Sequence, residues 1–230
     1  MPYVFLAVPH YGQIVANALE SLIAATTKHR IHMQTVGGSL LAYCFNSLWC
    51  HALNKRKDGI THFVMHHSDI NAEPCWLDKL VEEQQAQKAD ILSVVIPIKD
   101  KRGVTSTARM RPDGQIVRLT VHEIHNLPAT FSGSSVQPDT LLVNTGLMIV
   151  DFTKPWVENF SFNIADGIKK LDSGRYAPLV LPEDWNMSLW AHHHNLKVHA
   201  TRKVKATHWG PAGFSNDQPG DWQTDQGDTF

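Results

Sequence analysis

This sequence of 230 residues has only three cysteines, no long apolar run and no excess of charge of one sign. The formal net charge of −1 provides no general field that would attract nucleic acid. The three cysteines cannot all pair with one another, so a reduced, cytoplasmic setting is the simple interpretation. Because no window of about 18 apolar residues exists, we expect no membrane-spanning segment. We also see no secretory signal at the N-terminus.

Several motifs that mark common enzyme classes are missing as well. The chain has no Walker loop, no G-x-G-x-x-G and no C-x-x-C. The segment FSGSS at 131–135 lacks the flanking strand and helix of a hydrolase elbow. We therefore do not expect an NTPase, a dinucleotide-dependent dehydrogenase or a serine hydrolase.

The first part of the chain alternates between short apolar runs and segments with apolar residues at helical spacing. The apolar runs do not alternate with polar residues, which is typical of buried parallel strands. The order β-α-β-α-β-α-β predicts an α/β protein, a single domain with a central, mostly parallel sheet flanked by helices. The expected strands are 3–8, 31–36, 61–66 and 90–98, and the expected helices are 14–25, 40–53 with Ser39 as its cap, and a third through about 87.

The second part of the chain is less regular. Residues 99–114 contain turn signals and basic side chains, and residues 127–139 are rich in Pro, Ser and Gly, so we expect a long functional loop there. Other expected elements are a strand at 116–124, a strand at 141–151 interrupted by Gly146, a helix at 182–194 and a strand at 196–200. We place one domain at 1–214 and a polar, frayed tail at 215–230.

Two side chains are candidate metal ligands. Asp69 follows a predicted strand, where ligands bind in open α/β sheets, and a carboxylate there can hold a divalent cation. His208 lies in a predicted turn after a later strand, and imidazole together with carboxylate suits Mn²⁺ or, less well, Mg²⁺. The alternatives remain that Asp69 caps a turn and that His208 is a surface residue.

Two acidic residues begin the predicted helix at 182–194. Asp184 or Glu183, fixed at a helix N-terminus and facing a bound sugar, is a candidate general base. Acidic residues are also favoured there by the helix dipole alone, so an ordinary helix start is the alternative. Among the basic residues of the 99–111 segment, Lys99 and Arg102 are candidates for binding phosphate, and Tyr11 is a candidate for stacking on a nucleobase.

Six segments, taken in order, resemble a known family, the GT-A nucleotide-sugar glycosyltransferases, in a family-2-like, bacterial and phage-associated branch. The resemblance runs from about Tyr3 to Gly210. The segments are VFLAVPHYGQI, THFVMHHSDINAEPCWLDKL, VVIPIKDKRGVTSTA, NTGLMIVD, LPEDWNMSLWAHHHNLKVHA and VKATHWG.

The resemblance implies a role for each matching residue. Asp69 matches the last Asp of the D-x-D motif and His208 matches the C-terminal metal ligand, while Asp184 matches the base of inverting members, with Glu183 beside it. His67 stands where the family has the first Asp of the motif, and the branch's arginines after a D-S-L-I segment are missing. The implied donor-binding positions are Pro9, Tyr11, Gly12, Ser39, Asn46, His67, Lys99, Arg102 and Gly146.

The resemblance also implies an activity. The chain would transfer a sugar from a nucleotide-sugar, with UDP-sugar the first choice, to an acceptor hydroxyl, using Mn²⁺ or Mg²⁺ and inverting the anomeric carbon. A retaining transferase on the same fold, a non-catalytic nucleotide- or sugar-binding protein, and a nucleotidyltransferase are the alternatives. The acceptor stays open among a glycan, a lipid-linked sugar, a protein and modified DNA.

Overall fold

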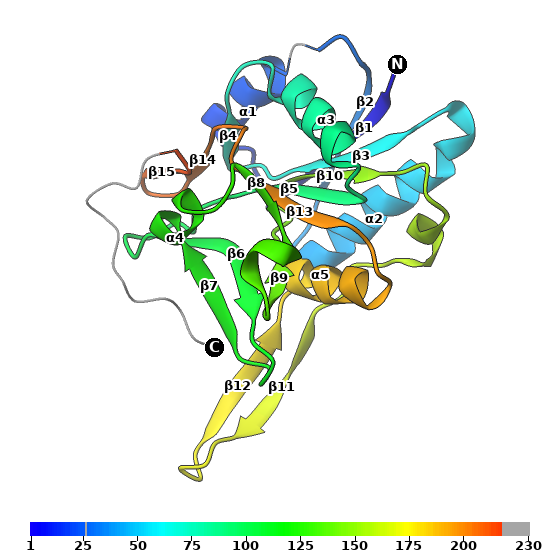
Figure 1. The fold of residues 1–230 in the computed structure, drawn as a ribbon. Coiled ribbons are helices and arrows are strands. Elements are labelled where there is room, and N and C mark those ends of the chain that lie inside the picture. The colour runs from blue at the N-terminus through cyan, green and yellow to red at the C-terminus, as the bar shows by residue number, and fades with distance from the viewer. Residues whose placement is uncertain (26, 218–230) are drawn as a thin grey trace.

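The computed structural model describes residues 1–25 and 27–217 and shows a mixed α/β fold around a seven-stranded sheet (Figure 1). The helices are α1 (Ala16–Ile23), α2 (Leu41–Asn54), η1 (Arg56–Asp58), α3 (Trp76–Gln87), α4 (Val121–His125), η2 (Gly133–Val136), η3 (Pro155–Asn159) and α5 (Glu183–His193). The strands are β1 (Tyr3–His10), β2 (Arg30–Gly37), β3 (His62–His66), β4 (Ile70–Ala72), β5 (Ile91–Val94), β6 (Val104–Met110), β7 (Ile116–Thr120), β8 (Thr130–Ser132), β9 (Thr140–Leu142), β10 (Leu147–Asp151), β11 (Ala165–Lys170), β12 (Tyr176–Leu181), β13 (Val198–Thr201), β14 (Ala206–Trp209) and β15 (Gly213–Ser215).

The central sheet has the strand order β2-β1-β3-β10-β5-β13-β8. Its parallel pairings are β1–β2, β1–β3 and β5–β13, and its antiparallel pairings are β3–β10, β5–β10 and β8–β13. The expectation of an α/β sheet flanked by helices is confirmed, but the expectation of a mostly parallel sheet needs correction, because the sheet is mixed. Two strands run opposite to the other five: β10, which enters between β3 and β5, and β8, at the edge of the sheet.

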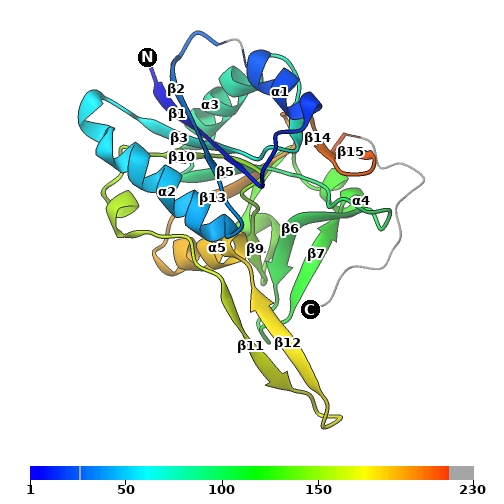
Figure 2. The same cartoon turned by 180° about the vertical axis from the view of Figure 1, so that it is seen from behind.

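Helices cover both faces of this sheet (Figures 1 and 2). Phe5 and Phe63 face one buried cluster that includes Phe45 and Trp49 of α2. Val4, Leu6 and Val64 face a second cluster that includes the apolar side of α3. Because both faces are buried, successive residues of β1 and β3 are all apolar or shielded, which explains why the sequence shows no alternation there.

The segment at 127–139 is not the long loop that its composition predicts. It contains β8, which pairs with β13 at the edge of the central sheet, and η2. Phe131 is buried in the core, and the Thr130 and Thr201 hydroxyls lie 2.8 Å apart. A segment bound to a sheet edge in this way is not free to close over a ligand.

Three other expected elements need correction. The strand expected at 116–124 ends at Thr120, because Thr120 and Glu123 form a capping box that begins α4. The helix expected at 40–53 begins without a side-chain cap, so Ser39 is not its N-cap. The turn-rich segment at 99–114 contains β6, which joins β7 and β9 in a separate three-stranded sheet.

The boundary of the expected tail also needs correction. Ser215 ends β15, and Asn216 is buried, so the folded part extends at least to Asp217. The Asn216 side chain accepts a hydrogen bond from the Ala206 N–H (3.0 Å) and donates to the Val95 and Val204 carbonyls (both 3.0 Å). Residues 218–230 of the expected tail lie outside the described residues.

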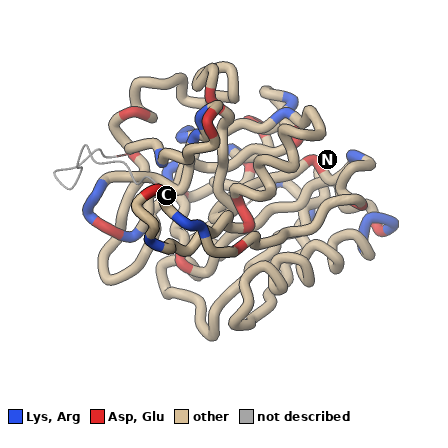
Figure 3. The backbone as a smooth tube through the Cα atoms, turned by 90° about the horizontal axis from the view of Figure 1, so that it is seen from below, with Lys and Arg blue, Asp and Glu red and all other residues tan. Residues whose placement is uncertain are grey.

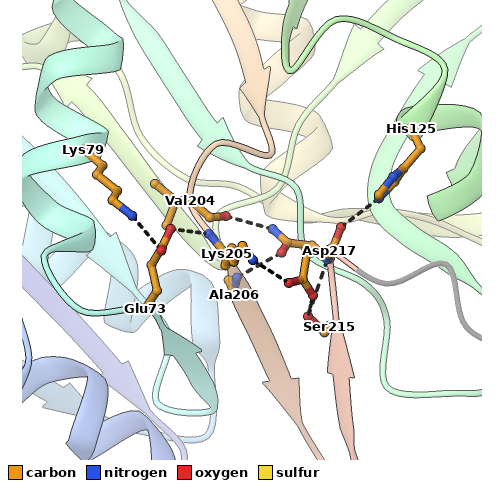
Figure 4. A network of polar contacts seen from close by, with 9 residues as sticks. Glu73, Lys79, His125, Val204, Lys205, Ala206, Ser215 and Asp217 are labelled. Atoms are coloured by element: carbon orange, nitrogen blue, oxygen red, sulfur yellow. Dashed lines mark hydrogen bonds and ion pairs between the residues drawn. The ribbon is translucent and has the colours of Figure 1, made fainter.

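Ion pairs lie close to the segment that the Asn216 hydrogen bonds hold in place (Figure 4). The Lys205 Nζ lies 3.2 Å from the Asp217 carboxylate, and the Lys79 Nζ lies 2.6 Å from Glu73. The Glu73 carboxylate also accepts a hydrogen bond from the Lys205 N–H at 2.9 Å. These contacts tie the start of β14 to the segment between β4 and α3. In the described ranges, no helix combines the length and the apolar character needed to cross a lipid bilayer.

We predict that Asn216→Ala lowers the free energy of unfolding by about 2 kcal/mol, because it leaves buried partners of three hydrogen bonds unsatisfied. Urea unfolding followed by circular dichroism measures the change. Asn163→Ala is the matched control, since the Asn163 side chain is exposed and bonds only within its own loop. Equal midpoints for the two variants, at equal slope, would contradict the anchoring role of Asn216.

Candidate active site

The pairing of β4 with β14 brings Asp69 and His208 together. His208 stands opposite Ile70 in this antiparallel pair, and the Trp209 N–H donates to the Asp69 carbonyl at 2.8 Å. The His208 Nε2 lies 3.3 Å from the Asp69 Oδ2. Two residues that are far apart in the sequence are therefore in contact at the end of β3. His208 lies in a strand, not in the turn that the sequence predicts.

The hydrogen bonds of His208 determine which ring nitrogen carries the proton. Its Nδ1 lies 2.8 Å from the Pro97 carbonyl, which can only accept, so the Nδ1–H donates there. In the neutral ring the Nε2 then presents a lone pair toward the Asp69 carboxylate. Two acceptors 3.3 Å apart repel each other unless a proton or a cation lies between them. This orientation by a backbone carbonyl is also the usual arrangement of a metal-binding histidine.

The separation of these two atoms also fits a shared cation. Two neighbouring ligands of an octahedral ion, each about 2.1 Å from it, lie about 3 Å apart. The Asp69 Oδ2 and the His208 Nε2 are close to that spacing. Within the part of the chain that the structure describes, no group of three or more His, Cys, Asp or Glu side chains forms a complete metal site. A metal held here would take its remaining ligands from a bound molecule or from water.

Lys99 is the third member of this cluster. Its Nζ lies 2.7 Å from the same Asp69 Oδ2. Burial acts to raise the pKa of Asp69, but His208 and Lys99 outweigh burial and hold it well below its ordinary range, so the carboxylate is ionised. The stem of Lys99 passes over Gly210, where an added Cβ would come within 3.1 Å of the lysine Cδ. The sequence did not single out Gly210, whose role is to leave room for this side chain.

His67 and Gly146 border the cluster. The His67 N–H donates to the Gly146 carbonyl at 2.8 Å, and the His67 Nε2 lies 3.4 Å from the Thr145 hydroxyl. Burial lowers the pKa of His67 to about 4, so the ring is neutral near pH 7. A Cβ on Gly146 would come within 3.1 Å of the Asn144 Oδ1 and 3.4 Å of Ile96, so the glycine leaves room for these two side chains beside the cluster.

His66 is buried next to the site and supports it through hydrogen bonds, although the sequence did not predict it as a site residue. Its Nδ1 lies 2.9 Å from the His67 carbonyl and its Nε2 lies 3.0 Å from the Ser21 hydroxyl. The Ser21 hydroxyl in turn accepts a hydrogen bond from the Ala72 N–H at 2.9 Å. This buried chain fixes the turn that carries Asp69 between α1 and β4. Burial lowers the pKa of His66 to about 4.

The loop after β1 lies beside the same turn, since the Val15 N–H donates to the Ser68 carbonyl at 2.9 Å. Tyr11 is 74% exposed, so its ring does not pack into the core. Gly12 has a φ of +79°, a left-handed conformation that favours glycine. Pro9 is buried within β1 and positions this loop without being open to a ligand.

Asp184 and Glu183 begin α5, as expected. Burial and, after it, the negative charge of Glu183 raise the pKa of Asp184 to about 7, against the opposing effects of the Trp185 N–H and the Arg118 guanidinium. Burial also raises the pKa of Glu183. The Asp184 Oδ1 accepts a hydrogen bond from the Trp185 N–H at 2.7 Å. A carboxyl group with such a pKa can exchange protons near neutral pH.

One short segment connects α5 to the Asp69 cluster. The Ser188 hydroxyl, one turn after Asp184, accepts a hydrogen bond from the Val143 N–H at 2.9 Å. Residues 144–146 continue from there to His67. On the other side, the Trp185 indole donates to the Ser106 carbonyl at 3.1 Å, and the Arg118 guanidinium lies 4.6 Å from the Trp185 ring centre. Arg118 is a charged neighbour of Asp184 that the sequence did not single out.

Three expected donor-binding residues are engaged elsewhere or lie apart. The Asn46 side chain exchanges two hydrogen bonds of 2.8 Å with the Phe162 backbone, so it fixes that segment to α2. Arg102 forms an ion pair with Asp100 at 2.6 Å. Ser39 is exposed before α2 and makes no capping bond. Figure 3 shows that Lys and Arg alternate with Asp and Glu along the described backbone.

The fold and this cluster describe an α/β protein with a carboxylate, an imidazole and an ammonium group gathered at the strand ends of its central sheet. No protein-family model matches the chain, and no curated protein matches it. The chain is similar to a solved structure, the crystal structure of A197 from STIV, with a TM-score of 0.57 and 16% sequence identity. The similarity covers 94% of this chain and 91% of A197 and, at this identity, shows a shared fold.

We predict that His66 and His67 destabilise the folded protein as the pH falls from about 6.5 to about 4. His66 and His67 titrate near 6.5 when unfolded but near 4 when folded, so the unfolded state binds more protons in this window. His66→Gln should lower the number of protons taken up on unfolding in this pH window by about one, and with it the slope of stability against pH. Chemical unfolding at a series of pH values measures the slope. His193→Gln, on the exposed end of α5, is the control, and a His66→Gln slope equal to the wild-type slope would contradict the assignment.

Proposed function

We propose that this protein is a metal-dependent glycosyltransferase that transfers a sugar from a nucleotide-sugar to an acceptor hydroxyl. The observation that carries the proposal is the contact of Asp69 with His208, whose Nδ1–H is held by the Pro97 carbonyl so that its Nε2 faces the carboxylate. Such a pair fits a divalent cation, and the cation would be Mn²⁺ or Mg²⁺. The resemblance of the six segments to GT-A enzymes supports the same function.

Each residue of the site has a role in this proposal. Asp69 and His208 would hold the ion, and the ion would neutralise charge that develops on the leaving diphosphate. Lys99 would pair with a phosphate oxygen once the metal ion takes its place at Asp69. His67, which is neutral, would hydrogen-bond to a donor hydroxyl, and Gly146 would let the sugar approach the backbone. Tyr11 would stack on the base, which we propose to be uracil.

Asp184 would act as the general base. Its pKa of about 7 means that near neutral pH it is present both as carboxylate and as acid, so it can accept a proton from the attacking hydroxyl. Attack opposite the leaving diphosphate would give inversion at the anomeric carbon. The raised pKa favours this inverting reaction over the retaining alternative, in which Asp184 would only position the acceptor.

A binding experiment tests the metal and donor site. We expect Mn²⁺ and UDP together to raise the melting temperature of the wild-type protein, because a ligand that binds only the folded state stabilises it. Asp69→Asn and His208→Gln should each lose this increase. Asp217→Asn and His193→Gln, which change the same residue types outside the site, should keep it. If all four variants respond like the wild type, Asp69 and His208 are not the site.

A kinetic experiment tests the base. We expect Asp184→Asn to lower the rate of nucleoside diphosphate release from the bound nucleotide-sugar about 10²–10⁴-fold. The wild-type rate should rise with pH through about 7, and the variant should lose this rise. Undiminished release in the variant would remove Asp184 from the mechanism.

The same variant provides an internal check on folding. The pKa of Asp184 is higher in the folded than in the unfolded state, so ionisation of this group opposes folding as the pH rises from about 4 to 7. Asp184→Asn should therefore be at least as stable as the wild type above pH 7, measured by urea unfolding. A rate loss accompanied by lower stability would point to structural damage instead.

A further inference from the structure

The hairpin of β11 and β12 extends away from the rest of the protein (Figures 1 and 2). Its two strands form a sheet of their own, and no third strand from residues 1–25 or 27–217 joins it. Every residue of β11 is exposed, including Ile168 at 79%. Because a lone two-stranded hairpin is marginally stable in water, an apolar one requires an explanation.

The strand register divides the hairpin into two faces. Val180, Pro178 and Tyr176 of β12 stand opposite Asp166, Ile168 and Lys170 of β11, and these six side chains share one face. Tyr176 is 71% exposed and Ile168 is 79% exposed. Apolar side chains therefore lie in the middle of this face. Along β11, Asp166 precedes them and Lys170 follows them, toward the turn of the hairpin.

The free edges of the two strands differ. The Leu171 N–H donates to the Arg175 carbonyl at 2.8 Å, so hydrogen-bonded and non-hydrogen-bonded pairs alternate from there along the hairpin. Ile168 and Pro178 then form a non-hydrogen-bonded pair, and the nitrogen of Pro178 faces the outer edge of β12. Since proline has no N–H, that edge is interrupted. The outer edge of β11 carries the backbone N–H and C=O groups of Asp166, Ile168 and Lys170.

We propose that β11 pairs antiparallel with β11 of a second copy of this chain, with the two-fold axis at Ile168. This register places Ile168 opposite the partner's Ile168. It also places Asp166 opposite the partner's Lys170, and by symmetry Lys170 opposite the partner's Asp166. The outward backbone groups of these three residues hydrogen-bond in the same register. The result is a four-stranded sheet, β12-β11-β11-β12, with one continuous apolar face.

Charge favours a second copy over a lipid surface as the occupant. A face that binds anionic lipid carries Lys and Arg without acidic residues between them. Asp166 lies on the same face as Lys170, and the two are spaced symmetrically about Ile168. Opposite charges placed directly across an antiparallel pair stabilise it, and like charges destabilise it. This inference does not depend on the proposed sugar transfer.

Charge exchange tests the register. Analytical ultracentrifugation should show a wild-type dimer. Asp166→Lys alone, or Lys170→Asp alone, places like charges opposite each other twice per dimer and should weaken dimerisation about tenfold or more. The double variant Asp166→Lys with Lys170→Asp should restore it. Weakening by both single changes without restoration in the double variant would overturn this register.

A cross-link tests the symmetry axis independently. Cysteines directly opposite each other in an antiparallel pair lie close enough to form a disulfide. Ile168→Cys should therefore give an oxidised dimer joined at position 168, located by peptide mapping because Cys50 and Cys75 are also exposed. Tyr176→Cys, on the other strand, should not form such a bond. A monomeric wild type at high concentration, or a monomer that binds phosphatidylserine vesicles through the hairpin, would overturn the proposal.

Discussion

The antiparallel pairing of β4 with β14 is the constraint on which the candidate site depends. β4 follows Asp69 directly and β14 contains His208, so the register His208 opposite Ile70 sets the distance between the two side chains. Neither strand belongs to the central sheet. Their position is held from both ends, by Ser21 bonding to Ala72 and by Asn216 bonding to Ala206. The buried polar groups His66, Ser21 and Asn216 therefore act on the site without belonging to it.

The two carboxyl groups of the proposed mechanism have pKa values that are shifted in opposite directions. Asp69 lies against Lys99 and His208, and these partners keep its pKa low in spite of burial. Asp184 lies at the start of α5 with Glu183 as an acidic neighbour, and burial raises its pKa to about 7. Titratable groups whose surroundings shift their pKa values apart are typical of acid–base sites. A permanently charged group suits a cation, and a group that titrates near pH 7 suits proton transfer.

The sequence predicted the convergence of Asp69 and His208 better than it predicted the sheet. Asp69 was a candidate because it follows a buried strand, and ligands bind at the ends of such strands in an α/β sheet. The end of a buried strand can be located in the sequence from the local run of apolar residues. His208 was a candidate from its position after a predicted strand and from the resemblance, and the sequence placed it in a turn because the short β14 has no pattern of its own. The direction of β10 was not predictable, since a buried strand reads the same in parallel and antiparallel sheets. The role of Asn46 was not predictable either, because its partner Phe162 lies far along the chain.

The ammonium group of Lys99 would have one partner when no metal ion is bound and another when an ion is bound. Without another cation, its ammonium group lies 2.7 Å from Asp69 and balances the carboxylate. Lys99 and a divalent ion at the same oxygen would repel each other, so an ion that binds Asp69 must displace the lysine. The stem of Lys99 lies against Gly210, and the side chain is 41% exposed, which leaves its end free to turn toward an incoming anion. A bound diphosphate would supply that anion, so the displacement of Lys99 would couple the binding of the ion to the binding of phosphate.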